Sequence, residues 1–164
     1  MVNVTPMEVK IPITAEGYQK KLEELKQLKS VERPKAIESL KTAREHGDLS
    51  ENAEYDAAKE HQAFIHKRIH ELEDRIARME VIKPMTIKSD RVLFGAHVRV
   101  VDTSKSLERT FQLVGEDEAD IGNGKISIKS PIALALIGKA VNDTAQVKTP
   151  DGIREYEIIH VEYK

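Results

Sequence analysis

The chain of 164 residues has no cysteine, which excludes disulfide bonds and thiolate metal sites. Tryptophan is also absent and aromatic residues make up only 4%, so the cores must consist mainly of Leu, Ile, Val and Ala. No stretch approaches the run of about 20 apolar residues that spans a membrane. The first residues lack the apolar run of a signal peptide. We therefore expect a cytoplasmic protein with no membrane partner.

An excess of positive charge is also missing, since 26 Lys and Arg stand against 28 Asp and Glu. Proteins that bind duplex DNA usually carry a basic excess or stripe. We therefore expect no independent binding of duplex DNA, and any nucleic-acid role would work through a protein partner or a small local patch. The sequence has no Walker loop, GxGxxG motif or nucleophile-elbow serine. Nothing in it predicts a self-contained active site.

Residues 14–82 have the apolar spacing of helices. Thr14 is placed to cap the first helix, and the apolar pattern shifts near Pro34, where we expect a kink or a local irregularity. The pattern resumes at Ile37 and Leu40. Farther along the chain, the spacing becomes the heptad seam of a coiled coil. The residues of this seam are Ile65, Ile69, Leu72, Ile76 and Met79.

Two long helices with a short connection should fold back as an antiparallel hairpin. About 30 residues per arm would make it about 45 Å long. The alternative is half of an ordinary helical bundle, but the sequence offers no third long helix to complete one. Toward residues 46–52, the expected tip, the seam becomes smaller and more polar.

The pattern changes to a period of two after a predicted linker at residues 83–90. Between the later strands, Ser130 and Pro131 are suited to begin a short apolar helix that Gly138 would end. We therefore predict an α+β protein with a hairpin domain at 1–83 and, at 84–164, a small antiparallel sheet with one helix. The expected strands are 96–101, 110–114, 125–129, 145–148 and 153–163.

The expected tip carries clustered acids in the stretch HGDLSENAEY, residues 46–55. Asp48 and Glu51 have the spacing of a capping box, which would stabilise the start of the second helix. They also lie one helical turn apart at an exposed position, where two carboxylates could complete the shell of a metal ion held mainly by another molecule. The two interpretations are compatible, because a carboxylate has several lone pairs.

Three other features have weaker functional interpretations. His66 and His70 have a spacing that can bind Zn²⁺, but a solvated helix surface is the better interpretation without a third ligand. Arg44, Lys41 and Lys59 flank the tip and could form a small patch for RNA phosphates or be ordinary surface charges. The acidic stretch GEDEAD at 115–120 lacks the spacing of a calcium loop, so we expect a solvated loop.

Three stretches together resemble the Gre family of bacterial transcript-cleavage factors. They are AREHGDLSENAEYDAAKE at 43–60, GEDEADIGNGKISIKSPIALALIGK at 115–139 and EYEIIHVEYK at 155–164. The resemblance covers nearly the whole chain in the same order, and GDLSENAEY is highly specific. It is this resemblance that suggests RNA polymerase as the partner.

The resemblance implies that the coiled coil enters the secondary channel of RNA polymerase. There, Asp48 and Glu51 would help to hold a Mg²⁺ ion shared with the polymerase, none being bound tightly by the free protein. The polymerase would then cleave the 3′ end of its nascent RNA in backtracked, arrested complexes. The protein would be a cofactor of that reaction, acting as a monomer, and not an enzyme by itself.

The resemblance also assigns roles to other residues. Tyr55, Arg44, Lys59 and Asn52 would support the tip and face the RNA, in a basic patch of the smaller kind that goes with cleavage of short RNA ends. The second domain would be FKBP-like and would grip the β′ coiled coil at the rim of the channel. The residues that match this contact are Ser130, Pro131 and Ile132.

Two alternatives belong to other functional classes. A regulator could occupy the channel and inhibit the polymerase without cleavage, although regulators of that kind carry altered tips and this chain retains GDLSEN. The second domain could also be a prolyl isomerase or chaperone. Against this, only Phe94, Phe111, Tyr156 and Tyr163 are aromatic beyond residue 83, too few to favour a proline-binding pocket.

Overall fold

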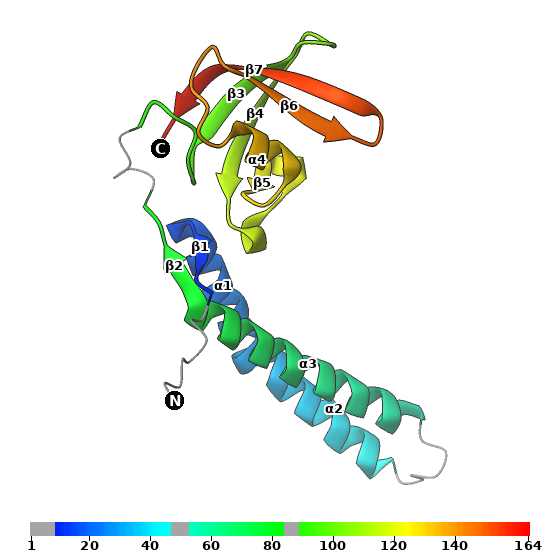
Figure 1. Ribbon diagram of the computed structural model, residues 1–164. Coiled ribbons are helices and arrows are strands. Elements are labelled where there is room, and N and C mark those ends of the chain that lie inside the picture. The colour runs from blue at the N-terminus through cyan, green and yellow to red at the C-terminus, as the bar shows by residue number, and fades with distance from the viewer. Residues whose placement is uncertain (1–8, 47–52, 84–88) are drawn as a thin grey trace, which may run out of the picture. The chain divides into compact units, whose positions relative to one another are not determined.

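The computed structural model describes residues 9–46, 53–83 and 89–164, which fall into two compact units (Figure 1). The first unit, within residues 18–79, holds the paired helices. The second, residues 9–17 and 80–164, holds a curled sheet. The fold is α+β, as predicted. The segments 9–17 and 80–83, which we expected with the hairpin, group with the second unit.

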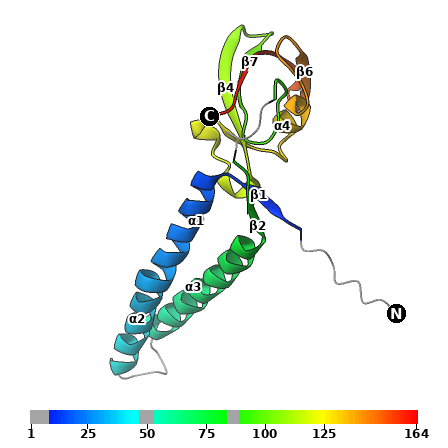
Figure 2. The same cartoon turned by 90° about the vertical axis from the view of Figure 1, so that its left-hand side faces the viewer.

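Two antiparallel helical arms form the first unit (Figures 1 and 2). One arm consists of α1 (Ala15–Gln27), a π-helical turn η1 (Leu28–Glu32) and α2 (Arg33–Glu45). The other is the single helix α3 (Ala53–Arg78), whose 26 residues span about 39 Å. The predicted hairpin is therefore confirmed. Among the described helices, none is long and apolar enough to cross a membrane.

The irregularity expected near Pro34 is the π-helical turn just before it. In η1 the backbone N–H of Arg33 donates to the carbonyl of Leu28, five residues back instead of four. Pro34 has no N–H to offer and its ring would crowd the carbonyl four residues earlier in a regular helix. The wider turn accommodates the proline ring without interrupting the helical arm.

The seam between the arms follows the prediction on most of α3 but not on α2, and the predicted seam residue Met79 lies instead in the short strand that follows α3. Ile65, Ile69 and Leu72 are buried. On α2, however, Ile37 is 49% exposed, and Ala36 and Ala43 are buried instead. The π-helical turn adds a residue to the arm, so the face turned toward α3 differs from the one a continuous helix would present. Our placement of Ile37 in the seam was wrong for this reason.

The helical segment also ends earlier than predicted. We expected helix to residue 82, but α3 ends at Arg78 and the short strand β2 (Met79–Val81) follows. This strand pairs with β1 (Ile11–Ile13), and the N–H of Ile82 donates to the carbonyl of Ile13 at 2.9 Å. Strands of three residues are too short to show a period of two, so the sequence pattern did not reveal them.

Five strands in the order β5-β4-β3-β7-β6 build the main sheet. Neighbouring strands are antiparallel except β4 and β5, which run parallel. The short helix α4 (Pro131–Leu136) buries Ala133 and Leu136 in the same core as the sheet. The strands are β3 (His97–Asp102), β4 (Leu107–Val114), β5 (Lys125–Ser127), β6 (Thr144–Thr149) and β7 (Gly152–Glu162).

Candidate functional site

The acidic stretch lies between the far ends of the two arms. The helix α2 ends at Glu45, with His46 as its C-cap, and α3 begins at Ala53. The connection between them is therefore short, as predicted. Asp48, Glu51 and Asn52 lie outside the described residues, so their proposed roles stay predictions. What the structure describes is the pair of helix ends on which they are mounted.

Arg44 and Tyr55 join these two helix ends. Arg44 is in the last turn of α2 and Tyr55 in the first turn of α3, and the guanidinium carbon lies 5.8 Å from the centre of the tyrosine ring. A cation–π contact of this kind contributes about 0.5–1 kcal/mol at an exposed site. Two residues to which the family resemblance assigns support of the tip are thus in direct contact across the hairpin.

A second contact lies beside the first. The Nδ1 atom of His46 is 3.3 Å from the Oε2 atom of Glu54. Both side chains are exposed, so this pair contributes little to stability, but it joins the same two helix ends. Lys59 is exposed one helical turn beyond Tyr55, so the two occupy neighbouring positions on one face of α3.

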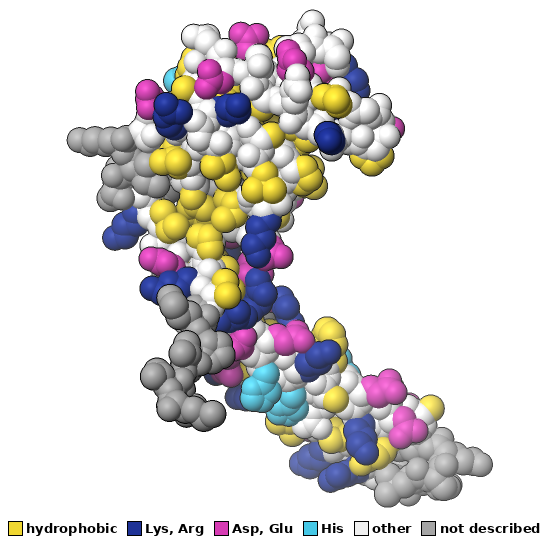
Figure 3. Space-filling view, in the orientation of Figure 1, with side chains coloured by type: hydrophobic (Ala, Val, Ile, Leu, Met, Phe, Trp, Pro, Cys, Tyr) yellow, Lys and Arg dark blue, Asp and Glu magenta, His cyan; other side chains and the backbone are white. Residues whose placement is uncertain are grey.

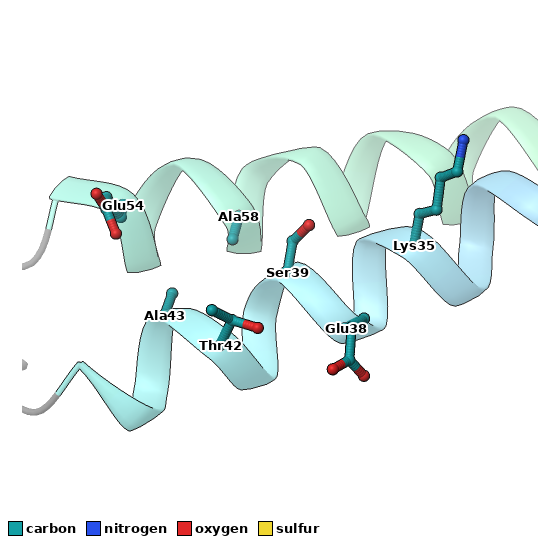
Figure 4. Close-up of a pocket in the computed structure, with 7 residues that line it drawn as sticks. All are labelled: Lys35, Glu38, Ser39, Thr42, Ala43, Glu54 and Ala58. Atoms are coloured by element: carbon teal, nitrogen blue, oxygen red, sulfur yellow. The ribbon is translucent and has the colours of Figure 1, made fainter.

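A groove of about 510 Å³ runs between α2 and α3 next to these contacts (Figure 4). Small side chains, including Ala43 on α2 and Ala58 on α3, line it where the two arms face each other. The seam near the tip is therefore smaller and more polar than the Ile and Leu seam farther along α3, as predicted. The other lining residues are Lys35, Glu38, Ser39, Thr42 and Glu54.

The residues expected to contact a partner in the second unit lie at the start of α4. The hydroxyl of Ser130 accepts the N–H of Ala133 at 3.3 Å, which confirms the predicted helix cap. Pro131 is exposed, while Ile132 is half-buried against the core. Next to them, Leu134 and Ile137 are 63% and 39% exposed, and in Figure 3 hydrophobic side chains gather on this part of the unit.

Glu118 has a structural role that the sequence pattern does not predict. We expected the stretch 115–120 to be a solvated loop, but Glu116–Glu118 forms a 3₁₀ turn. The Glu118 carboxylate accepts the backbone N–H groups of Thr14 and Gly115, both at 3.0 Å, and also the Thr14 hydroxyl proton. The Thr14 hydroxyl oxygen in turn accepts the N–H of Gly17 at 3.1 Å, as expected of the cap of α1.

No metal site is found within residues 9–46, 53–83 and 89–164, where no three His, Asp or Glu side chains are grouped suitably for an ion. His66 and His70, which have a metal-binding spacing, are both exposed on α3. This agrees with the interpretation of a solvated helix surface.

Comparisons with known proteins cover both units. A family model described as the N-terminal part of a transcription elongation factor matches residues 11–81, and one described as the C-terminal part of the transcription elongation factor GreA/GreB matches 87–163. The transcription elongation factor GreA of Hyphomonas neptunium is 55% identical over 155 residues, covering 94% of this chain and 99% of its own.

A second relative, the GreA of Syntrophotalea carbinolica, is 50% identical over 157 residues, covering 96% of this chain and 99% of its own. Among solved structures, the GreA factor homolog 1 (Gfh1) of Thermus thermophilus is 26% identical, with a TM-score of 0.43. That match covers 93% of this chain and 99% of the homolog. The two family matches and the identity to GreA proteins along nearly the whole length establish that the chain belongs to the GreA/GreB family of transcription elongation factors.

Proposed function

We propose that this protein enters the secondary channel of RNA polymerase with its helical hairpin and stimulates cleavage of the RNA 3′ end in arrested complexes. It acts in the cytoplasm, as a monomer, and the cleaved bond belongs to the transcript held by the polymerase. The observation that carries this proposal is the pair of antiparallel helical arms, whose far ends on either side of the acidic stretch are joined by the contact of Arg44 with Tyr55.

The rigidity of these ends is the physical reason that such a tip would work. A misplacement of about 1 Å in a reacting group can cost about a hundredfold in rate. The contacts of Arg44 with Tyr55 and of His46 with Glu54 both restrict how far the two helix ends separate. They would therefore hold the intervening acids in place against the moving parts of a large partner.

Asp48 and Glu51 fit the chemistry of Mg²⁺, which prefers carboxylate and other oxygen ligands. Two acids are fewer ligands than an octahedral ion requires, so the polymerase would supply the others. The ion, when shared, would supply charge stabilisation and an activated water to the cleavage reaction. The contribution of this chain is to deliver two acceptor groups on a fixed support.

The second unit would provide the grip on the polymerase. Leu134 on α4 and Ile137, the residue that follows it, leave apolar surface exposed near Ser130 and Pro131, while Ala133 and Leu136 of the helix are buried in the core. Exposed apolar residues grouped on one element are typical of a contact surface for another protein. This supports the β′ coiled coil at the channel rim as the place where α4 docks.

The test is transcript cleavage in a stalled elongation complex. We expect Asp48→Asn and Glu51→Gln each to slow cleavage at least about tenfold, equivalent to about 1.4 kcal/mol of transition-state stabilisation. The same variants should bind the polymerase as the unchanged protein does, because the hairpin and α4 are unaltered. The matched control is Asp56→Asn, which removes a nearby acid of the same helix end and should leave the rate unchanged.

Full cleavage by both acid variants would contradict the proposal and leave the capping box as the only role of this pair. Inhibition of RNA synthesis without shortened RNA would instead identify a channel-blocking regulator. Measuring binding and cleavage on the same complexes separates loss of docking from loss of chemistry.

A further inference from the structure

A hollow of about 190 Å³ lies on the second unit, away from α4 and the residues discussed above. It opens on the face of the main sheet opposite the hydrophobic core. Three strands, β3, β4 and β7, contribute its walls. The lining residues are His97, Arg99, Thr110, His160, Glu162 and Lys164.

An irregularity in β7 creates this hollow. Opposite Arg99 and Val100 on β3, the partner residue changes from His160 to Ile158, so Ile159 is an extra residue and forms a β-bulge. In a regular strand, residues two apart point to the same face. Here Ile158 is buried in the core while His160 is exposed, because the bulge reverses the alternation.

Beyond the bulge the reversed alternation continues. Val161 and Tyr163 pack against the core, and Glu162 is exposed on the other face with Lys164. The bulge therefore brings the polar side chains of β7 to the face that already carries His97 of β3. Bulges often re-aim side chains next to functional sites, which makes this cluster a candidate for binding.

The formal charges around the hollow balance while the imidazoles are neutral. Arg99 Nε lies 3.0 Å from a carboxylate oxygen of Glu108, and Lys164 Nζ lies 4.0 Å from Glu162. His160 Nε2 is 3.9 Å from the same Glu162 oxygen. A proton taken up by His97 therefore adds a net positive charge to a cavity already lined by hydrogen-bond donors.

The surroundings of His97 favour an added anion. Burial holds the pKa of His97 below its ordinary value, and the charge of Lys164 lowers it further. Glu162 opposes this effect, and Lys125 on β5 reinforces it. A negative group in the hollow would offset the two lysines, so binding and protonation of His97 would support each other.

We propose that this hollow binds a phosphate group, either the phosphodiester of a nucleic acid or a free phosphate, and the two probes below distinguish these sources. Arg99 and Lys164 supply positive charge, Thr110 supplies a hydroxyl donor, and each imidazole supplies an N–H donor. Protonation of His97 adds a second donor and a positive charge. Affinity therefore rises as the pH falls. The site lies on the unit that holds α4, and it does not depend on the proposed cleavage activity.

The experiment is a titration of the full-length protein with a uridine hexanucleotide, followed by amide NMR shifts. The phosphodiesters of this probe keep their charge over the range used, so a pH effect reports on the protein. We expect shifts centred on the hollow and an affinity about five- to tenfold higher at about pH 6 than at about pH 8. Inorganic phosphate, as a second probe, should shift the same amides more weakly.

Two variants and a control decide the outcome. The double variant His97→Gln and His160→Gln should lose the pH dependence, and Lys164→Gln, at an exposed position that does not disturb the core, should weaken binding at both pH values. The control, His66→Gln with His70→Gln, removes as many imidazoles from the other unit and should change neither. Shifts confined to the hairpin, or a pH dependence that persists in the first double variant, would overturn the proposal.

Discussion

Glu118 shows how a single side chain can fix the beginning of a helix from far along the chain. Its carboxylate accepts hydrogen bonds from the backbone and hydroxyl of Thr14, 104 positions earlier, and from the nearby Gly115 backbone. Gly17 lies so close that a β-carbon added there would be 1.9 Å from a carboxylate oxygen of Glu118. The glycine in the first turn of α1 is therefore a consequence of the glutamate.

We expect Gly17→Ala to lower the free energy of unfolding by about 1–2 kcal/mol, because Glu118 must swing away and give up its hydrogen bonds. In a Glu118→Ala background the obstacle is gone, and Gly17→Ala should then stabilise by up to about 1 kcal/mol through helix propensity. Thermal and chemical denaturation of the four proteins measures both effects.

Gly122→Ala is the matched control, since a β-carbon there meets only an oxygen of Asp120 at 3.5 Å. It should change stability by much less. If Gly17→Ala changed the free energy of unfolding in the same direction with and without Glu118, the glutamate would not be the reason that residue 17 is a glycine.

Glu24 makes the stability of the hairpin depend on pH. Burial would raise its pKa, but hydrogen bonds from Arg68 and Lys21 outweigh burial and hold the pKa below its ordinary value. Because the folded-state pKa is depressed, the stabilisation is present above the unfolded-state value and is lost as the pH falls through the folded-state value.

Melting curves recorded by circular dichroism should therefore show helix stability falling as the pH drops below about 4.5, the ordinary value for Glu24. Glu24→Gln should lower the melting temperature near neutral pH and reduce its change with acid. Glu23→Gln, at the exposed neighbouring position, is the control. Equal acid sensitivity in both variants would assign the effect to other carboxylates.

At the level of secondary structure, the first arm of the hairpin depends on the π-helical turn before Pro34. This turn lets the chain accommodate a proline in the middle of a long arm and decides which residues of α2 meet α3. Ala36 and Ala43 are buried in the seam as a result, and Ile37 is exposed.

Deletion of Ser30 should close the wide turn into a regular helix and force the Pro34 ring against the preceding turn. We expect a loss of about 3 kcal/mol, the usual penalty for proline in a helix interior. The same deletion combined with Pro34→Ala should recover most of that stability. Denaturant unfolding measures both, and an equal loss in the two proteins would mean that the proline is not what the turn accommodates.

The sequence predicted those elements whose signals are local. The heptad spacing of Ile65, Ile69 and Leu72 gave the seam of α3, and Ser130 with Pro131 gave the start of α4. It did not predict the shifted seam on α2, because nothing in the composition of residues 28–32 distinguishes a π turn from an α turn. Nor could it assign Glu118 a partner, since the two groups are joined only by tertiary folding.

The candidate site was predictable to a similar extent. The contact of Arg44 with Tyr55 follows from a short connection between antiparallel helices, and the roles of the tip acids came from family resemblance. The hollow on the sheet was not predictable. It depends on a one-residue bulge at Ile159, and the alternation of β7 looks regular until that bulge is placed.

For the whole molecule, the boundary between units does not follow chain order. Residues 9–17 precede the hairpin but group with the sheet, where Ile13 is fully buried. Residues that are close neighbours along α1 therefore belong to different units.

Ile13→Ala should destabilise the second unit by about 2–4 kcal/mol, the usual cost of truncating a buried isoleucine. Hydrogen exchange should show faster exchange at the amides of β2 and of the 3₁₀ turn Glu116–Glu118, with the buried seam of α3 unaffected. Ile65→Ala serves as the comparison and should give the opposite distribution. If Ile13→Ala instead accelerated hydrogen exchange in α3, Ile13 would belong to the hairpin unit and not to the second unit.

The pairing of Thr14 with Glu118 also has a consequence for the order of events during synthesis. A ribosome adding about 5–20 residues per second needs about 5–20 s to make the 104 residues between them. The arms of the hairpin, whose contacts are nearer in sequence, have their partners sooner. Thr14 is thus made long before its partner, and a nascent chain halted before Glu118 would carry the paired arms while the cap of α1 still lacks this carboxylate.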